Sequence, residues 1–499
     1  MSEEVSAKPV TPVADPNRFK ALFVIAIAQL MIVLDASIVN LAIPSAQADL
    51  GIAPQDIQWV VTAYTLAFGG FLLLGGRIAD FTGRKRTFIV GLLGFALASL
   101  LGGLALNSGQ LFAARGLQGA FAALLAPSAL ALITVTFHDP KERAKAFGVF
   151  GAISGGGAAI GLLLGGVLTE YLSWRWCLAV NTPIAVIAAL LAVRFVRESK
   201  AHGDTNYDVP GAITVTGGLL ALVYAFTQAA PAGYEDSAHW TDPSTLMWFG
   251  LAIVLLASFF VIESRSAHPL LPLRVISDSN RAGAYLSTLM VGAGMFAMFL
   301  FLGIFMQTIL GYSPVQAGLA FLPFSVGVIL GAGVASNLLP RIGPRPMMIP
   351  GLIAGASGML WLAQLQPDSA YLTHVLPAMV VMSLGMSFVF IPTATVALHA
   401  VDHHDAGVAS AMINTSQQVG GSLGTALMNT VAVTATSAYL AANAAQGQLA
   451  MPAALTEGFT HGFYVGAALL LTAAVVVFFM IRVGADAAAE EDEAPVHIG

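Results

Sequence analysis

The sequence predicts an all-α polytopic membrane protein, and three observations carry that prediction. Apolar residues make up 57% of the chain and charged residues only 10%, with a mean hydropathy of +0.80, outside the range of soluble domains. Apolar runs long enough to cross ~30 Å of hydrocarbon as a helix recur about fourteen times. The 51 glycines and 24 prolines suit lipid, where glycine permits close helix packing and neighbouring helices satisfy the backbone groups that proline frees.

The polar segment before the first span holds three prolines and lacks the apolar core and cleavage site of a signal peptide, which predicts a disordered cytoplasmic tail. The acidic run Glu490–Glu493 predicts a solvated end. The lone Cys177 excludes an intramolecular disulfide and any multi-cysteine metal site. In chain order, the predicted spans are 20–43, 57–77, 86–107, 111–136, 144–168, 177–196, 210–230, 245–263, 283–310, 316–339, 346–365, 372–394, 408–433 and 461–482.

The distribution of lysine and arginine predicts the orientation of these spans. With the N-terminus inside, all but two of the 21 basic residues fall on the cytoplasmic side, as the positive-inside rule requires. The exceptions are Arg175 at the outer face and Arg115 within the fourth span. An even number of spans therefore places both termini in the cytoplasm of an inner (plasma) membrane protein. The outer loops carry acids instead: Asp49, Asp56, Glu235, Asp236 and Asp242.

A short charged loop occurs twice and predicts a duplicated architecture. Residues 76–86 lie between the second and third spans, and a degenerate echo at 339–345 lies between the tenth and eleventh. Each half then has six spans, and two spans remain between the halves, with no charge expected within the membrane. The predicted organisation is a tail at 1–19, a six-helix bundle at 20–200, a two-helix insert at 201–280, a second six-helix bundle at 281–483 and an acidic tail at 484–499. Such repeats place a substrate site at their interface.

Several motifs carry a resemblance to a known family. The strong ones are residues 34–44 of the first span, the loop at 76–86, and residues 115–119 of the fourth span; weaker ones are Trp59 with Tyr64, residues 174–176 and residues 311–314. Over nearly the whole chain, these motifs resemble those of the fourteen-span drug:proton antiporters of the major facilitator superfamily. The resemblance implies the major facilitator fold, with two extra central helices. It also implies export of bulky amphipathic compounds in exchange for protons.

Asp35 is the candidate for proton coupling, with Arg115 as its partner. A carboxylate within a span costs ~2.5–3.5 kcal/mol, so one that persists usually faces a cavity or a partner. Counting ~1.5 Å per residue from each span's start puts both side chains at a similar depth. Burial disfavours an ionised carboxylate and a guanidinium favours it, so such a pair is suited to binding and releasing a proton. The alternative is a structural ion pair that only joins two helices. The predicted spans after residue 283 contain no acid, which assigns proton chemistry to the first half.

Two glycine-containing motifs are further candidates. The resemblance gives Gly76, Asp80, Gly83 and Arg84 a gating role on the cytoplasmic side, and the alternative is a topological anchor. In the fifth span, Gly157, Gly161 and Gly165 share one helix face, with Gly166 beside it, and the alternative there is a generic close-packing face. This stretch resembles the family's antiporter signature, except that Leu162 replaces its proline. A proton-coupled uptake symporter of the same fold therefore stays open.

Polar and aromatic residues within the spans are candidates for a substrate cavity. Each of them could instead join helices or fill a core. One intramembrane acid supplies one counter-charge, which favours neutral or monocationic amphiphiles as substrates. The candidates are Gln29, Asn40, Trp59, Tyr64, Gln118, Phe299, Gln307, Asn414 and Gln418.

Other functional classes lack the residues they need. The run Asp402–Asp405 has metal-ligating residue types, but adjacent histidines in a short turn converge poorly on one ion, so no metal site is expected. No nucleophile with catalytic partners, phosphate-binding loop or large soluble domain is present, which argues against an enzyme, a receptor and ATP-driven transport. The expected partners are small-molecule substrates, protons and the bilayer, with no nucleic acid and no cofactor beyond a proton gradient as the energy source.

Overall fold

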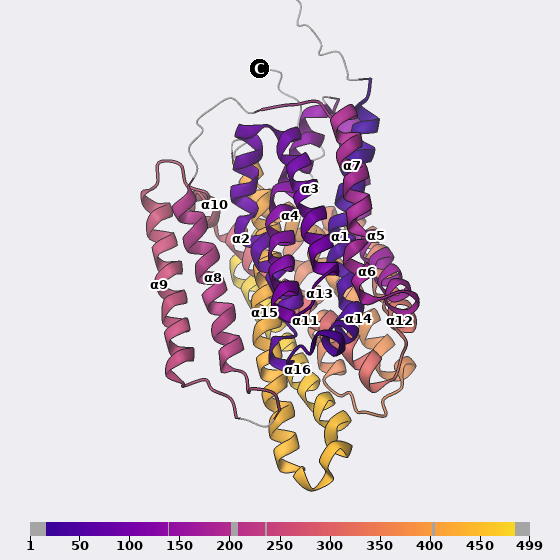
Figure 1. The fold of residues 1–499 in the computed structure, drawn as a ribbon. Helices are drawn as coiled ribbons and strands as arrows, with labels where there is room; N and C mark the ends of the chain where they lie inside the picture. Colours follow the sequence, from indigo (N-terminus) through magenta and orange to yellow (C-terminus); the bar gives the residue numbers. More distant parts are fainter. Residues whose placement is uncertain (1–15, 138, 201–207, 235–236, 402–404, 485–499) are drawn as a thin grey trace, which may run out of the picture.

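The computed structural model describes residues 16–137, 139–200, 208–234, 237–401 and 405–484, and the regular elements over these residues are all helices (Figure 1). Twelve helices in the described residues are long and apolar enough to cross a membrane. The predicted polytopic helical protein is therefore confirmed in outline, and the predicted count of fourteen spans is not. Three predictions concern residues outside this description: most of the N-terminal tail, the acidic C-terminal tail, and residues 402–404 of the rejected metal run.

The first six-helix group runs from α1 to α7. Its helices are α1 (Arg18–Leu50), α2 (Trp59–Thr82), α3 (Arg84–Gly103), α4 (Ser108–Thr136), α5 (Pro140–Tyr171), α6 (Trp174–Ala179) and α7 (Asn181–Phe195). The last two follow each other directly and together form one candidate span, Trp174–Phe195. The start of α2 is preceded by a single turn at Pro54–Asp56.

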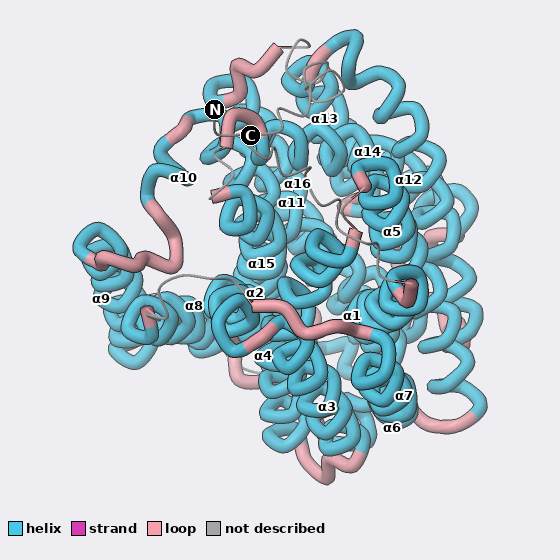
Figure 2. The backbone as a smooth tube through the Cα atoms, turned by 90° about the horizontal axis from the view of Figure 1, so that it is seen from above, coloured by secondary structure: helices cyan, strands magenta, loops and turns pink. Residues whose placement is uncertain are grey.

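Two long helices, α8 (Val209–Ala229) and α9 (Pro243–Arg265), lie beside the main body of the molecule (Figures 1 and 2). A short α10 (Leu273–Ser277) leads from them into the second six-helix group. This group comprises α11 (Ser279–Ile304) with a wider π-turn at Phe305–Ile309, α12 (Pro314–Ile342), α13 (Pro344–Leu362), α14 (Leu376–Leu398), α15 (Ala406–Ala442) and α16 (Met451–Met480). A π-turn at Tyr371–Val375 precedes α14, and a short helical segment at Ala444–Ala450 joins α15 to α16.

Local sequence signals explain where several helices begin and end. The Asp139 side chain accepts hydrogen bonds from the backbone N–H groups of Lys141 and Glu142, and Pro140 starts α5 with its fixed backbone angle. Ser313 and Gln316 form a reciprocal capping box at α12. At the end of α1, Gly51 has φ of 63°, a left-handed conformation that glycine adopts without steric cost.

The main difference from the predicted spans lies in the ends of helices. Helix α16 begins at Met451, ten residues before the predicted boundary, and so includes Glu457. The two central spans were expected to hold no charge, and this expectation is wrong for α9. Glu263 lies in its last turn with only 3% of its surface exposed. The burial of Glu263 could not be expected from sequence, because an acid at the end of an apolar run is usually hydrated.

The two six-helix groups meet mainly through α5 with α12 and α2 with α15. Figure 1 shows that α1 begins and α16 ends at one end of the molecule, called the terminal end below. Polar contacts between the groups gather at the opposite end. There Glu170 Oε2 accepts a hydrogen bond from Val315 N at 2.9 Å, and Asn429 Nδ2 donates to the carbonyls of Pro54 and Gln55.

Candidate functional site

Asp35 and Arg115 form a buried ion pair inside the first helix group. Asp35 lies in the middle of α1 and Arg115 in the second turn of α4, with 0% and 1% of their side-chain surfaces exposed. Arg115 Nη1 lies 2.6 Å from Asp35 Oδ2. The guanidinium also donates from Nε to the Val60 carbonyl and stacks on the Tyr64 ring, 4.5 Å from its centroid. Its position is therefore fixed from α1, α2 and α4 together.

The second carboxylate oxygen of Asp35 is held by two amides. Oδ1 accepts hydrogen bonds from Gln118 Nε2 at 3.0 Å and from Asn181 Nδ2 at 2.7 Å. Both amides also donate to Ser99 Oγ, at 2.9 and 3.2 Å. The Ser99 hydroxyl in turn donates to the Leu178 carbonyl at 2.7 Å. The carboxylate thus sits at the centre of a network from α1, α3, α4 and α7, which compensates for its removal from water.

Two members of this network, Asn181 and Ser99, were not among the residues predicted from sequence. Both are fully buried in apolar helices. The available signal was the position of Asn181, a few residues into the sixth predicted span, because a polar side chain in lipid needs a partner just as a charge does. Its Oδ1 atom is buried without a hydrogen-bond partner, as is the Tyr64 hydroxyl. Two buried polar atoms beside the ion pair are therefore able to form a further hydrogen bond.

The glycine face of α5 packs against the helix that carries Asp35. A Cβ on Gly157 would meet Leu30 and Val33, one on Gly161 would meet Ser37 and Leu34, and one on Gly165 would meet Ile38. Gly166 points differently, toward Pro314 and Val315 of α12 in the second helix group. The absence of side chains brings α1 and α5 to backbone contact.

We predict that Gly161→Ala lowers the free energy of unfolding by about 1–3 kcal/mol and with it the melting temperature. The new methyl group overlaps Ser37 Oγ and approaches the Leu34 carbonyl. The matched control is Gly151→Ala, on the same helix, where a Cβ meets nothing within 4 Å. Thermal unfolding of the purified variants measures both. Equal melting temperatures for the two variants would contradict the close packing of α1 and α5.

The predicted gating residues form a compact structure at the terminal end. Arg84 donates from Nε and Nη2 to Asp80 Oδ1, at 2.9 and 2.7 Å. Between them Gly83 has φ of 120°, and its missing side chain leaves room for the Glu198 carboxylate. Glu198 accepts hydrogen bonds from the Lys85 and Arg86 N–H groups at the start of α3, where a negative charge is stabilised. A Cβ on Gly76 would make only an ordinary van der Waals contact with Pro127. Glu198 was not predicted from sequence.

The nine predicted cavity residues lie on several helices of both groups. Gln118 and Tyr64 belong to the Asp35 network, and Trp59 faces Tyr224 of α8, with ring centroids 6.4 Å apart. Gln418 packs on Gly69 where α2 meets α15. The others are distributed over three helices and the π-turn after α11: Gln29 and Asn40 on α1, Phe299 on α11, Gln307 in the π-turn and the exposed Asn414 on α15.

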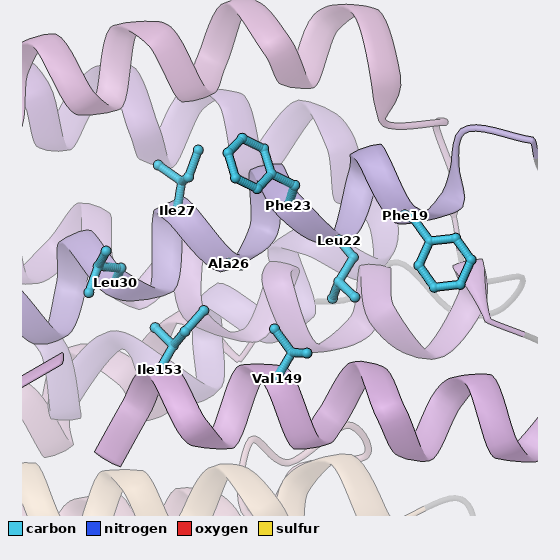
Figure 3. Close-up of a pocket in the computed structure, with 8 residues that line it drawn as sticks. All are labelled: Phe19, Leu22, Phe23, Ala26, Ile27, Leu30, Val149 and Ile153. Atoms are coloured by element: carbon cyan, nitrogen blue, oxygen red, sulfur yellow. The ribbon is translucent and has the colours of Figure 1, made fainter. Parts of the chain in front are cut away.

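A groove of about 340 Å³ lies between the beginning of α1 and α5, and none of these nine residues lines it (Figure 3). Its lining is entirely apolar: Phe19, Leu22, Phe23, Ala26, Ile27, Leu30, Val149 and Ile153. Phe23 is 62% exposed, which is expected of a lipid-facing side chain. The groove offers no polar group that would orient a substrate.

Comparisons with known proteins place this geometry in context. A sequence model described as Major Facilitator Superfamily matches residues 25–425. The chain is 47% identical to the puromycin resistance protein pur8 of Streptomyces alboniger, covering 99% of this chain and 98% of that protein. It is 39% identical to the cephamycin export protein CmcT of Amycolatopsis lactamdurans, covering 84% and 85%. Among solved structures, an inward-facing bacterial homologue of the human lysosomal transporter Spinster matches with a TM-score of 0.69 at 16% identity, covering 95% and 99%.

Proposed function

Because the chain belongs to the Major Facilitator Superfamily, we propose that it is a secondary transporter that exports amphipathic small molecules in exchange for protons. Members of this family are transporters rather than enzymes. The similarity to proteins named for puromycin resistance and cephamycin export supports drug or antibiotic export as the physiological direction. An uptake symporter of the same fold is not favoured by these relatives.

The buried ion pair is the observation that carries the proton part of the proposal. The described hydrogen-bond partners of the Asp35 carboxylate, one guanidinium and two amides, all donate to it. An ionised carboxylate can only accept hydrogen bonds, so the described conformation suits the ionised form. A proton on Asp35 turns one oxygen into a donor and weakens its attraction to Arg115. The helices that carry these groups must then rearrange, which links proton occupancy to conformation.

Asn181 is suited to both protonation states. Its Nδ2 now donates to the carboxylate, and its buried Oδ1 lacks a partner. Turning the amide by half a revolution presents Oδ1 to a protonated Asp35, which then donates to it. One side chain can therefore stabilise either state without leaving the network.

The architecture of the proposal is fourteen spans with both termini in the cytoplasm. Helices α13 and α15 contain 19 and 37 residues and lie among helices that do meet the criteria for spans. At ~1.5 Å per residue each is long enough, or nearly so, to cross the hydrocarbon. We assign both as spans, which keeps the two helix groups equal and the basic residues inside. In this arrangement α1–α7 and α11–α16 are the moving halves, and α8–α9 is an insert.

The gating loop and the contacts between the halves support alternating access. In this proposal, the contacts at the end opposite the termini close the outer face, and the described conformation corresponds to a state open toward the cytoplasm. The Asp80–Arg84 pair is then free to meet the other half when the transporter opens outward. The glycine face of α5 lets α1 and α5 slide at backbone contact during this change.

The decisive experiment uses everted membrane vesicles that contain a pH-sensitive dye and an acidic lumen. Addition of puromycin, or of a monocationic amphiphile such as ethidium, is expected to release protons from the lumen. Vesicles without the protein are the control. A symporter would release protons only when substrate is loaded inside, so that pattern would replace the proposal with uptake. A dication that releases protons as readily as a monocation would contradict the proposed charge preference.

A further inference from the structure

Two acids at the terminal end of the α8–α9 pair are buried and belong to no site described so far. Asp208 caps the start of α8 and Glu263 lies in the last turn of α9, with 7% and 3% of their surfaces exposed. Each uses one carboxylate oxygen. Asp208 Oδ1 accepts from Gly211 N at 2.8 Å, and Glu263 Oε2 accepts from Leu271 N at 3.1 Å.

The remaining oxygen of each acid is buried without a hydrogen-bond partner. These atoms, Asp208 Oδ2 and Glu263 Oε1, both lie 2.9 Å from the position that a Cβ on Gly211 would occupy. They therefore border the same small space, which glycine leaves open. Two ionised carboxylates so close together and shielded from water repel each other, and one of them is readily protonated.

The charged surroundings favour a single bound proton. Arg77 of α2 donates from Nη2 to the Pro269 carbonyl at 3.0 Å, which holds its guanidinium within electrostatic range of Glu263. The described contacts include no ion pair between Arg77 and either acid. Two carboxylates, one proton and one guanidinium sum to zero charge, the arrangement that costs least in a buried place.

We propose that Asp208 and Glu263 bind one proton between them and form a second proton-binding site, separate from Asp35. The proton joins Oδ2 to Oε1, so that one carboxyl group donates and the other accepts. The shared proton links the beginning of α8 to the end of α9. Through Leu271 it also links them to the segment 269–271, whose Pro269 carbonyl accepts the hydrogen bond from Arg77 of the loop at 76–86. The site goes beyond the proposed export, and its test needs no transported compound.

The test is the pH dependence of thermal unfolding of the purified full-length protein in buffer free of sodium and potassium. The folded protein holds the shared proton while the unfolded chain releases it near neutral pH. The melting temperature of the wild type is therefore expected to fall by several degrees as the pH rises from mildly acidic to mildly alkaline. Glu263→Gln is expected to remove this fall, because the glutamine oxygen still accepts from Leu271 while its amide donates to Asp208.

Two further variants make the result specific. Asp208→Asn is the mirror replacement, with its amide donating to Glu263, and it should flatten the curve in the same way. His268→Gln replaces the imidazole that directly precedes Pro269 with an uncharged side chain, and it should leave the wild-type curve unchanged. Infrared difference spectra should show the carbonyl band of a protonated carboxyl group in the wild type and its loss in both acid variants.

Three outcomes would overturn the proposal. Parallel curves for the wild type and Glu263→Gln would show that the acids share no proton. Loss of the pH effect in His268→Gln would assign it to the histidine. Recovery of the wild-type melting temperature at alkaline pH on addition of sodium or potassium would assign the space between the acids to a metal cation instead.

Discussion

Replacing Asp35 with asparagine is expected to abolish substrate-triggered proton release from everted vesicles, down to the level of vesicles without the protein. Asparagine has nearly the same shape and can keep its place among Arg115, Gln118 and Asn181, but it carries no proton to exchange. Exchange of labelled for unlabelled substrate across the membrane moves no net proton. This exchange should continue in the variant, which separates loss of coupling from loss of folding.

The matched control for this variant is Glu457→Gln. Glu457 is also an acid on a long helix, but its side chain is 47% exposed and lies beside His461 at 3.6 Å. Water can hydrate the Glu457 carboxylate, so the residue needs no coupling role to be tolerated there. Its replacement should leave proton release intact. Unchanged proton release in Asp35→Asn would move the coupling site elsewhere and leave the buried pair as a structural link between α1 and α4.

The contact between Asp35 and Arg115 could be expected from sequence because charges in apolar spans are costly and few. Each needs a partner at a similar depth, and the first half offers only one obvious choice. The glycines of α5 are similar, since spacing by four residues places them on one face whatever that face contacts. The cost of a charge within a span and the periodicity of a helix both follow from the sequence alone, which is why these two features could be predicted.

Uncharged polar residues are less predictable because their type does not report which way they face. Gln118 and Tyr64, predicted to line a substrate cavity, contact the ion pair, and so does Asn181, which was not among the predicted residues. Trp59 packs on Tyr224 of α8, a contact that depends on where the inserted helices dock. Glu263 escaped notice because burial at the end of a span depends on the segment that folds over it. These outcomes are set by packing between helices that are distant in sequence.

Replacing Arg115 with glutamine is expected to have the largest effect on stability of any single change at the site, about 3–5 kcal/mol. The variant leaves Asp35 buried with amide donors but without its counter-charge, and it also removes the bond from Arg115 Nε to the Val60 carbonyl. The folded variant can relieve the uncompensated charge by binding a proton on Asp35. Because the unfolded chain binds that proton less tightly, the loss of stability should be smallest at acidic pH and should grow as the pH rises.

The double variant Asp35→Asn with Arg115→Gln tests the origin of this loss. It removes both charges and keeps amide groups that can hydrogen-bond to each other, so it should recover much of the stability lost in Arg115→Gln and show little pH dependence. Thermal unfolding of the two single variants and the double variant completes the cycle. If the losses of the single variants simply add, the two residues do not act as a pair. A double variant that is stable but releases no protons would separate what the pair does for the fold from what it does for transport.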